Sequence, residues 1–188
     1  MNREIKFTEE NFEKLKIGDK DSFDLLYQDY YLVLYRTALL ILGNKEDAED
    51  VLQDTFVSIY KKAKTLSDFE KLRPWIFSIL KNTSYTRYKK RKREFPDEFI
   101  LDKAEESPTY LGEDDFAEKS EIQDALMTLK EKEREVLVLY YYNDFSIEEI
   151  ASICKTFQGT VKSRLHRARK NLKKELLKTQ EEYEGELL

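Results

Sequence analysis

Residues 146–170 read SIEEIASICKTFQGTVKSRLHRARK, and this segment predicts the structure of the C-terminal part of the chain. Ser146 and Glu149 have the spacing of a capping box, which predicts that a short helix begins here. A break at Lys155–Phe157 separates this helix from a second one that begins at Gln158. Two helices joined by a three-residue turn are typical of a helix-turn-helix, a motif that places its second helix in the major groove of DNA.

The second helix of this motif carries side chains that suit contacts with DNA. Its N-terminal half is the part of a recognition helix that reaches base edges, and Arg164 and Arg167 suit bidentate contacts with guanine. Further polar and basic side chains there suit bases or phosphates: Thr160, Lys162, Ser163, Arg169 and Lys170. The alternative interpretation is a basic helix that only packs beneath its neighbours.

The composition of the whole chain favours long helices over a turn-rich β fold. Its 188 residues include only 5 Gly and 3 Pro, and 38% are charged. The single Cys154, which we expect in the core, excludes an internal disulfide framework, and with the single His166 it leaves no zinc-binding set. Because no apolar signal segment or membrane-length run is present, we expect an all-α, cytoplasmic protein without membrane insertion.

Charge is sorted along the chain, although the net charge is only −5. Lys81–Arg93 contains seven basic residues and no acid, and Lys155–Lys174 contains eight basic residues and no acid. Between them, Glu94–Glu118 holds ten acids and one lysine. This pattern indicates two phosphate-contacting surfaces joined by a flexible acidic linker that repels itself.

Hydrophobic periodicity predicts two small helical domains on either side of the acidic segment. In the first domain we expect a short helix near Thr8–Lys16, a long helix that stops near Gly43 and a helix capped by Asn44. Pro74 suits the first turn of a further helix that ends near Arg91. The expected boundaries are 1–93 for the first domain, 94–118 for the linker, 119–178 for the second domain and 179–188 for an acidic tail. We expect the last helix to end near Leu177 and the acidic tail beyond it to be frayed.

Aromatic and basic side chains alternate along the last helix of the first domain. Single-stranded bases stack on aromatic faces while cations hold their backbone, so this pattern favours a single-stranded DNA surface. The residues concerned are Trp75, Lys81, Asn82, Tyr85, Arg87, Lys89 and Lys90. The alternative is that Trp75 anchors the core and the basic side chains are only solvated.

Residues 46–56, EDAEDVLQDTF, carry carboxylates at helical spacing. Such a set could hold a divalent metal, as a metal-dependent nuclease requires. Hard-cation sites draw ligands from several elements, however, and no cluster with a His or Lys base accompanies this one. The pattern therefore favours a solvated or partner-binding helix face, and we expect no metal, cofactor or catalytic residue.

In this order, the three segments resemble the sigma factors of bacterial RNA polymerase, in particular their extracytoplasmic-function group. AEDVLQDTF at 48–56 is similar to the core motif of the family's region 2. Trp75 with Asn82 seven residues later, followed by a basic run, is similar to a second segment of region 2. EEIA at 148–151 and GTVKSRLHRAR at 159–169 resemble the region 4 signature.

The resemblance implies a non-enzymatic role in transcription initiation, with core RNA polymerase, promoter DNA and an anti-sigma factor as partners and no small-molecule substrate. It gives docking on the coiled coil of the largest polymerase subunit to Asp47, Asp50, Gln53, Asp54 and Phe56. It adds Phe69 and Arg73 to the aromatic and basic residues at the end of the first domain, and this set would melt the minus-ten promoter element and hold a flipped base. The helix-turn-helix would read the minus-thirty-five element and meet the polymerase flap.

Two departures from the family pattern matter. Thr86 stands where the family often has an Asp, and the turn Lys155–Phe157 replaces a sequence like Gly-Ile-Pro. We therefore expect Lys155 to bear left-handed backbone strain and Phe157 to supply the apolar plug of the turn. The alternative function is a stand-alone helix-turn-helix regulator, which would leave the basic helix and the acidic motif unexplained.

Overall fold

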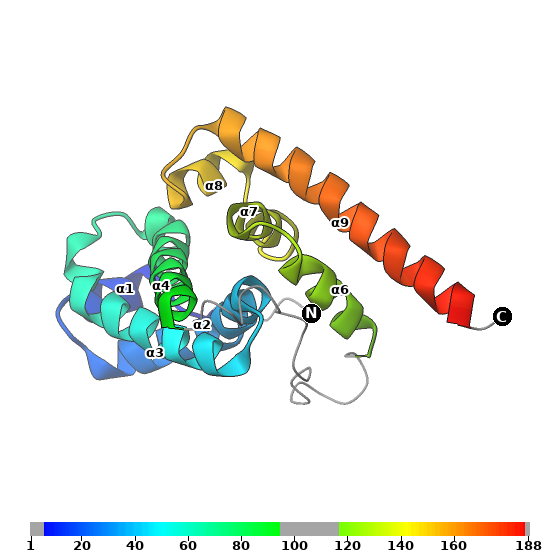
Figure 1. The fold of residues 1–188 in the computed structure, drawn as a ribbon. Coiled ribbons are helices and arrows are strands. Elements are labelled where there is room, and N and C mark those ends of the chain that lie inside the picture. The colour runs from blue at the N-terminus through cyan, green and yellow to red at the C-terminus, as the bar shows by residue number, and fades with distance from the viewer. Residues whose placement is uncertain (1–5, 95–116, 187–188) are drawn as a thin grey trace.

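The computed structural model describes residues 6–94 and 117–186, and every regular element in those ranges is helical. The first half contains α1 (Glu9–Lys16), α2 (Lys20–Leu42), α3 (Lys45–Lys62) and α4 (Leu72–Glu94) (Figure 1). The second half contains α6 (Ala117–Met127), α7 (Glu131–Tyr141), α8 (Ile147–Ile153) and α9 (Gln158–Glu186). The predicted all-α class is confirmed, whereas most of the expected linker lies outside the described residues.

Helix ends in the first half follow the local sequence signals. Thr8 forms a capping box with Asn11 at the start of α1. Gly43, with φ +84°, ends α2 in a left-handed conformation that glycine adopts without strain. Asn44 caps α3 by accepting a hydrogen bond from the backbone N–H of Asp47 at 2.8 Å.

Helices α2, α3 and α4 pack together around a core that the periodicity predicts. The side chains that α3 and its C-cap bury recur at helical spacing: Ala48, Val51, Leu52, Thr55, Phe56, Ile59 and Ala63. Two 3₁₀ turns, Ala63–Thr65 and Phe69–Lys71, connect α3 to α4. Burying each large apolar side chain contributes roughly 1.5–3 kcal/mol, so this core fixes the direction of α4 against α3.

The second half contains the expected helix-turn-helix. Ser146 and Glu149 form the predicted capping box at the start of α8, and Lys155 adopts the predicted left-handed conformation with φ +49°. The predicted role of Phe157 is wrong, because its side chain is 84% exposed. Phe157 lies just before α9, where its carbonyl accepts from the backbone of Val161, and the buried side chains of Ile153 and Val161 already fill the interior of the turn.

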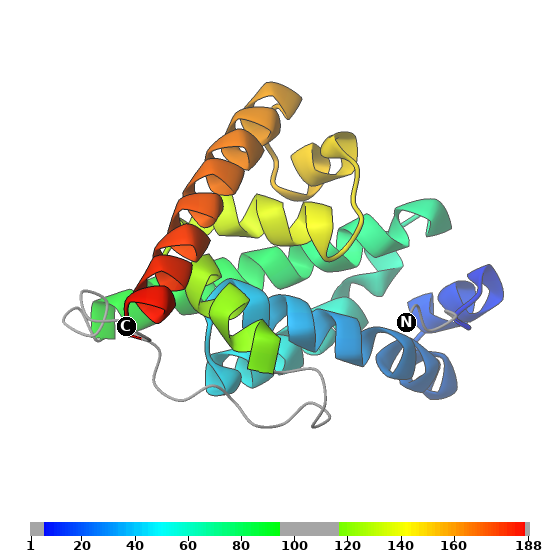
Figure 2. The same ribbon diagram turned by 90° about the vertical axis from the view of Figure 1, so that its right-hand side faces the viewer.

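Helix α9 continues to Glu186, past the predicted end near Leu177, so the acidic tail is largely helical rather than frayed. The helix lies along α6, α7 and α8, as Figure 2 shows from the side. Val161, Leu165 and Ala168 are buried against these helices.

The two halves share one continuous core, which the sequence pattern did not predict. Helices α7 and α8 pack on α2 and α4, as the two ribbon views agree (Figures 1 and 2). Phe145, which precedes α8, meets Phe77 of α4 edge-on with 4.8 Å between ring centroids. Val136 and Ile150 of the second half belong to the same buried cluster as Phe77. The described part of the molecule is therefore one packed body rather than two separate ones.

Candidate functional site

The acidic motif on α3 divides into an outward and an inward set. Asp50, Gln53 and Asp54 are exposed. Asp47 and Phe56, which the resemblance grouped with them, are only 5% and 4% exposed. The ring of Phe56 lies 4.6 Å from that of Tyr27 on α2, so it joins α3 to α2 rather than facing solvent.

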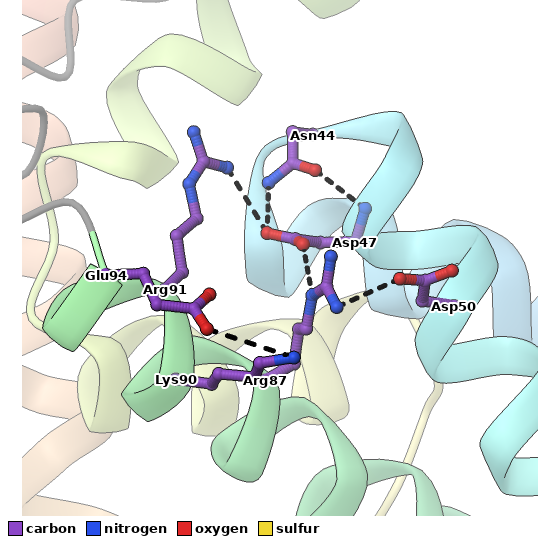
Figure 3. A network of polar contacts seen from close by, with 7 residues as sticks. All are labelled: Asn44, Asp47, Asp50, Arg87, Lys90, Arg91 and Glu94. Atoms are coloured by element: carbon purple, nitrogen blue, oxygen red, sulfur yellow. Dashed lines mark hydrogen bonds and ion pairs between the residues drawn. The ribbon is translucent and has the colours of Figure 1, made fainter.

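Asp47 is the centre of a polar network that ties α3 to the basic end of α4 (Figure 3). Asn44 donates to Asp47 Oδ2 at 2.7 Å, and Arg91 donates to the same oxygen at 3.2 Å. Arg87 donates to Asp47 Oδ1 through Nε and pairs with Asp50 Oδ2 at 2.9 Å through Nη1. Arg87, a predicted DNA contact, is thus held against the acidic helix in this structure.

The network shifts the pKa of Asp47 and of Arg87. Burial raises the pKa of Asp47, but hydrogen bonds from Asn44 and Arg87 outweigh it and hold this pKa below its ordinary value. The hydrogen bond to Asp47 raises the pKa of Arg87. The ionised pair therefore stabilises the packing of α4 on α3 at neutral pH.

The predicted minus-ten residues on α4 lie in different environments. Asn82, Lys89 and Lys90 are exposed. Trp75 is partly buried and packs on the core, which supports its alternative role as an anchor. Tyr85 lies between two cations, with Lys89 Nζ at 4.6 Å and Lys81 Nζ at 6.0 Å from its ring centroid.

Phe69 and Arg73, at the start of the same surface, already have partners. The ring of Phe69 lies 5.8 Å from that of Phe12 on α1. The Arg73 guanidinium lies over Phe145 at 4.1 Å from the ring centroid and donates to the carbonyl oxygen of Asn143. The N-terminal part of α4 therefore faces the second half of the molecule.

Helix α9 presents most of its predicted DNA contacts to solvent. The exposed members of the set are Lys162, Ser163, Arg167, Arg169 and Lys170, whereas Thr160 and Arg164 are partly buried. Arg167 pairs with Glu133 of α7 at 3.2 Å, and Arg169 lies 5.7 Å from the ring centroid of Tyr140. These contacts hold two of the cations in place from α7.

An apolar groove between α6, α7 and α9 was not among the predicted sites. It has a volume of about 510 Å³, and its mostly apolar lining also includes Arg169 and Lys173. Its apolar lining is formed by Ile122, Leu137, Tyr141, Leu172, Leu176 and Leu177. Ile122, Tyr141 and Leu177 are large apolar residues with exposed side chains. They are far apart in the sequence, so the apolar surface that they form is recognised only when the positions of the three helices are known.

A buried acid, Glu135, and a partly buried one, Glu131, lie on α7. Burial raises the pKa of Glu135 and of Glu131, and the charge of Lys81 opposes this shift at both. Burial also raises the pKa of Cys154, whose sulfur lies 3.5 Å from Glu135 Oε1. Cys154 is partly buried, and its thiol is held in the unreactive protonated form.

Two further properties concern only residues 6–94 and 117–186. No group of three or more His, Cys, Asp or Glu side chains there could hold a metal ion. No helix in these ranges has the length and apolarity to cross a membrane.

Comparison with known proteins matches both halves of the chain. The model of Sigma-70 region 2 matches residues 26–94, and that of Sigma-70, region 4 matches residues 119–172. The chain is 30% identical over 174 residues to the ECF RNA polymerase sigma factor SigW of Bacillus subtilis (strain 168), covering 87% of this chain and 93% of SigW. The chain belongs to the extracytoplasmic-function (ECF) group of the sigma-70 family. Another ECF sigma factor, EcfG of Rhodopseudomonas palustris (strain TIE-1), is 33% identical, covering 72% of this chain and 74% of EcfG.

Two solved structures share the fold of this chain. The sigma factor RpoE from Bartonella quintana, in complex with the anti-sigma factor NepR, is 32% identical with a TM-score of 0.64, covering 81% of this chain and 96% of RpoE. CnrH, in complex with the cytosolic domain of CnrY, has a TM-score of 0.68 at 24% identity, covering 90% of this chain and 96% of CnrH. We therefore call the half with α1–α4 region 2 and the half with α6–α9 region 4.

We predict that Asp47→Asn destabilises region 2 of this sigma factor by about 1–3 kcal/mol at pH 7, because it leaves Arg87 and Arg91 without their buried anion. The native pKa of Asp47 lies below its value in the unfolded chain, about 3.9, so the contribution is present above that pH. The difference between variant and wild type should shrink as the pH falls through the lowered pKa. Urea unfolding at several pH values measures this.

The matched control is Asp50→Asn, which removes an exposed carboxylate from the same network and should change stability by less than about 0.5 kcal/mol. An equal loss for Asp47→Asn at neutral and at acid pH would contradict the assigned role of the ionised carboxylate.

Proposed function

We propose that this ECF sigma factor directs promoter-specific transcription initiation of the alternative, signal-responsive type, with separate surfaces for core RNA polymerase and for two promoter elements. The observation that carries this function is the presence of region 2 and region 4 in order on one chain. A stand-alone helix-turn-helix regulator would need only region 4 and is not favoured. The proposed boundaries are 1–93 for region 2, 94–118 for the linker, 119–178 for region 4 and 179–188 for the acidic tail.

The exposed face of α3 is the proposed docking surface for core polymerase. Asp50, Gln53 and Asp54 are exposed, and Asp50 remains about half exposed although it pairs with Arg87, so this face is accessible to a basic partner. Asp47 and Phe56 support this face from within, through the Arg87 network and the contact with Tyr27. The proposed partner is the coiled coil of the largest polymerase subunit.

The proposed minus-ten surface follows α4 and the turn that precedes it. Asn82, Lys89 and Lys90 are accessible to a separated DNA strand, and Tyr85 offers a ring between two cations. Closer to the start of the helix, the proposed contacts are Phe69, Arg73, Trp75 and Lys81, and Arg87 lies beyond Tyr85. Stacking of single-stranded bases is worth about 1–3 kcal/mol each, enough to hold a melted element.

The exposed side of α9 is the proposed reader of the minus-thirty-five element. Lys162, Ser163 and Arg167 lie in the N-terminal half of the helix and are exposed, although Arg167 also pairs with Glu133. Thr160 and Arg164 are placed beside them, while Arg169 and Lys170 suit phosphates. The apolar groove between α6, α7 and α9 is the proposed site for the polymerase flap.

We further propose regulation by an anti-sigma factor in the cytoplasm, where a promoter-binding protein must act. The support is that RpoE, 32% identical, was solved in complex with the anti-sigma factor NepR. In this proposal the protein is not an enzyme, requires no cofactor and takes no small-molecule substrate, since its contribution is recognition rather than bond formation.

We predict that Asp54→Lys weakens binding to core polymerase at least tenfold, or about 1.4 kcal/mol, because it reverses the charge of the docking face. The measurement is a fluorescence titration of labelled sigma factor with core enzyme. Glu13→Lys is the matched control, because it makes the same charge change at an exposed position of α1. Wild-type affinity for core polymerase in Asp54→Lys would contradict the assignment of this face. Phe56→Ala is a poor test of docking, because it opens a cavity in the core and destabilises the fold.

We predict that Arg167→Ala lowers the affinity of the full-length protein for its minus-thirty-five element by about 1–3 kcal/mol and relaxes base preference. The measurement is a competition between specific and scrambled duplexes at fixed salt concentration.

Lys178→Ala is the matched control. It removes a different cation of the same helix, one that pairs with Glu175. An equal loss of affinity for both duplexes in Arg167→Ala would assign this residue to the DNA backbone and contradict base reading.

A further inference from the structure

We propose that Phe157 recognises a thymine at one end of the minus-thirty-five element, by placing its ring against the 5-methyl group that this base presents in the major groove. The proposal deepens the proposed function and rests on it, because it assumes that the start of α9 enters the groove there. It adds an apolar contact to a reading surface whose other proposed members are polar or basic.

The ring of Phe157 is more exposed than those of the tyrosines on the surface. Its exposed fraction is 84%, against 55% for Tyr141 and 50% for Tyr60. The rings of these two tyrosines rest on neighbouring rings, Tyr140 at 4.9 Å and Phe23 at 5.4 Å between centroids. Because the protein covers so little of Phe157, almost its whole ring is available to a partner.

Hydrogen bonds on both sides of Phe157 fix the backbone that carries this ring. Before it, the backbone N–H of Thr156 donates to the carbonyl oxygen of Ala151 at 2.9 Å. After it, the carbonyl oxygen of Phe157 accepts from the backbone N–H groups of Thr160 at 2.9 Å and Val161 at 3.1 Å. The ring therefore projects from a fixed position directly before α9, and binding a partner would restrict only its side-chain torsions.

The start of α9 leaves room for DNA to come close. Apart from its chain neighbours and the backbone of its own turn, no atom of the described residues lies within 4 Å of a Cβ added to Gly159. Gln158, Lys162 and Ser163 are exposed. In both ribbon views the start of α9 lies at an outer edge of the molecule, away from α1–α3 (Figures 1 and 2). The first turn of α9 can thus enter a groove together with the Phe157 ring.

The position of Phe157 along the axis of α9 places it beyond the bases that the helix itself would read. At about 1.5 Å per residue, Phe157 lies roughly 9 Å along the axis from Ser163. Base-pair steps are about 3.4 Å long, so this length corresponds to about two or three steps. The expected thymine therefore lies about two or three base pairs from the base beside Ser163, at one end of the element.

Thymine is the base whose chemistry fits this ring. Its 5-methyl group is apolar and faces the major groove, where apolar side chains such as Phe contact it. Exposed cations, Lys155 and Lys162, flank Phe157 in the sequence, which favours a phosphate-bearing partner over a basic protein surface. The apolar groove proposed for the polymerase flap begins about 22 Å farther along α9, at Leu172, so Phe157 belongs to a different surface.

Removal of the methyl group from the DNA tests the contact directly. Core polymerase carrying the full-length protein first selects duplexes from a pool randomised over the minus-thirty-five element. Each thymine of the tightest duplex is then replaced in turn by deoxyuridine, which lacks only the 5-methyl group. We expect about fourfold weaker binding at one terminal thymine for the wild type, as for the loss of one buried methyl group, and no loss there for Phe157→Ala.

Ile17→Ala is the matched control, because it also truncates an apolar side chain that is 86% exposed, at the end of α1. It should keep the wild-type sensitivity to deoxyuridine. Equal sensitivity of the wild type and Phe157→Ala at every thymine would overturn the proposal. An equal loss on all duplexes in Phe157→Ala would place the ring on the sugar–phosphate backbone and would also overturn it. Failure of the wild type to select any minus-thirty-five element would instead contradict the proposed function, on which the proposal rests.

A repeated selection provides a second test without modified bases. Core polymerase carrying Phe157→Ala should lose the preference for thymine at that one position and keep the preferences at the other positions of the element. An unchanged preference for thymine, or loss of preference at every position, would contradict the assigned role, since a residue that reads one base affects one position.

Discussion

The packing of Phe145 against Phe77 joins region 4 to region 2, and the arrangement of the two regions as one packed body depends on it. The two buried rings meet edge-on at 4.8 Å, a geometry worth about 0.5–1.5 kcal/mol beyond the burial of apolar area. Because the contact lies beside Arg73, it also decides which part of α4 faces solvent. A structural contact and a candidate DNA surface therefore share the same few side chains.

Acidic and basic side chains have different roles in different parts of the molecule. The overall charge of −5 disfavours nonspecific attraction to DNA, and the basic side chains are concentrated on α4 and α9. Acids on the inner face restrain some of these cations, as Asp47 does for Arg87 and Glu133 does for Arg167. In the proposed function, the remaining exposed cations, such as Lys162, would direct the approach of DNA without making the whole protein basic.

Local features were predictable from the sequence, whereas contacts between distant segments were not. The Asn44 cap, the capping box at Ser146 and the left-handed Lys155 depend on a few neighbouring residues, and the structure contains all three. The outward direction of Phe157 depends on which side chains already fill the turn, and the burial of Asp47 depends on two arginines forty or more positions away. Packing of region 4 on region 2 combines many such contacts, and helical periodicity carries no information about them.

The most direct test of the account is transcription from a library of randomised templates by core RNA polymerase with and without this protein. We predict that the protein enriches templates that share two separated elements upstream of a common start point, one for region 2 and one for region 4. No enrichment beyond that obtained with core polymerase alone, from protein shown to be folded, would contradict the assignment of this chain as a promoter-specificity factor.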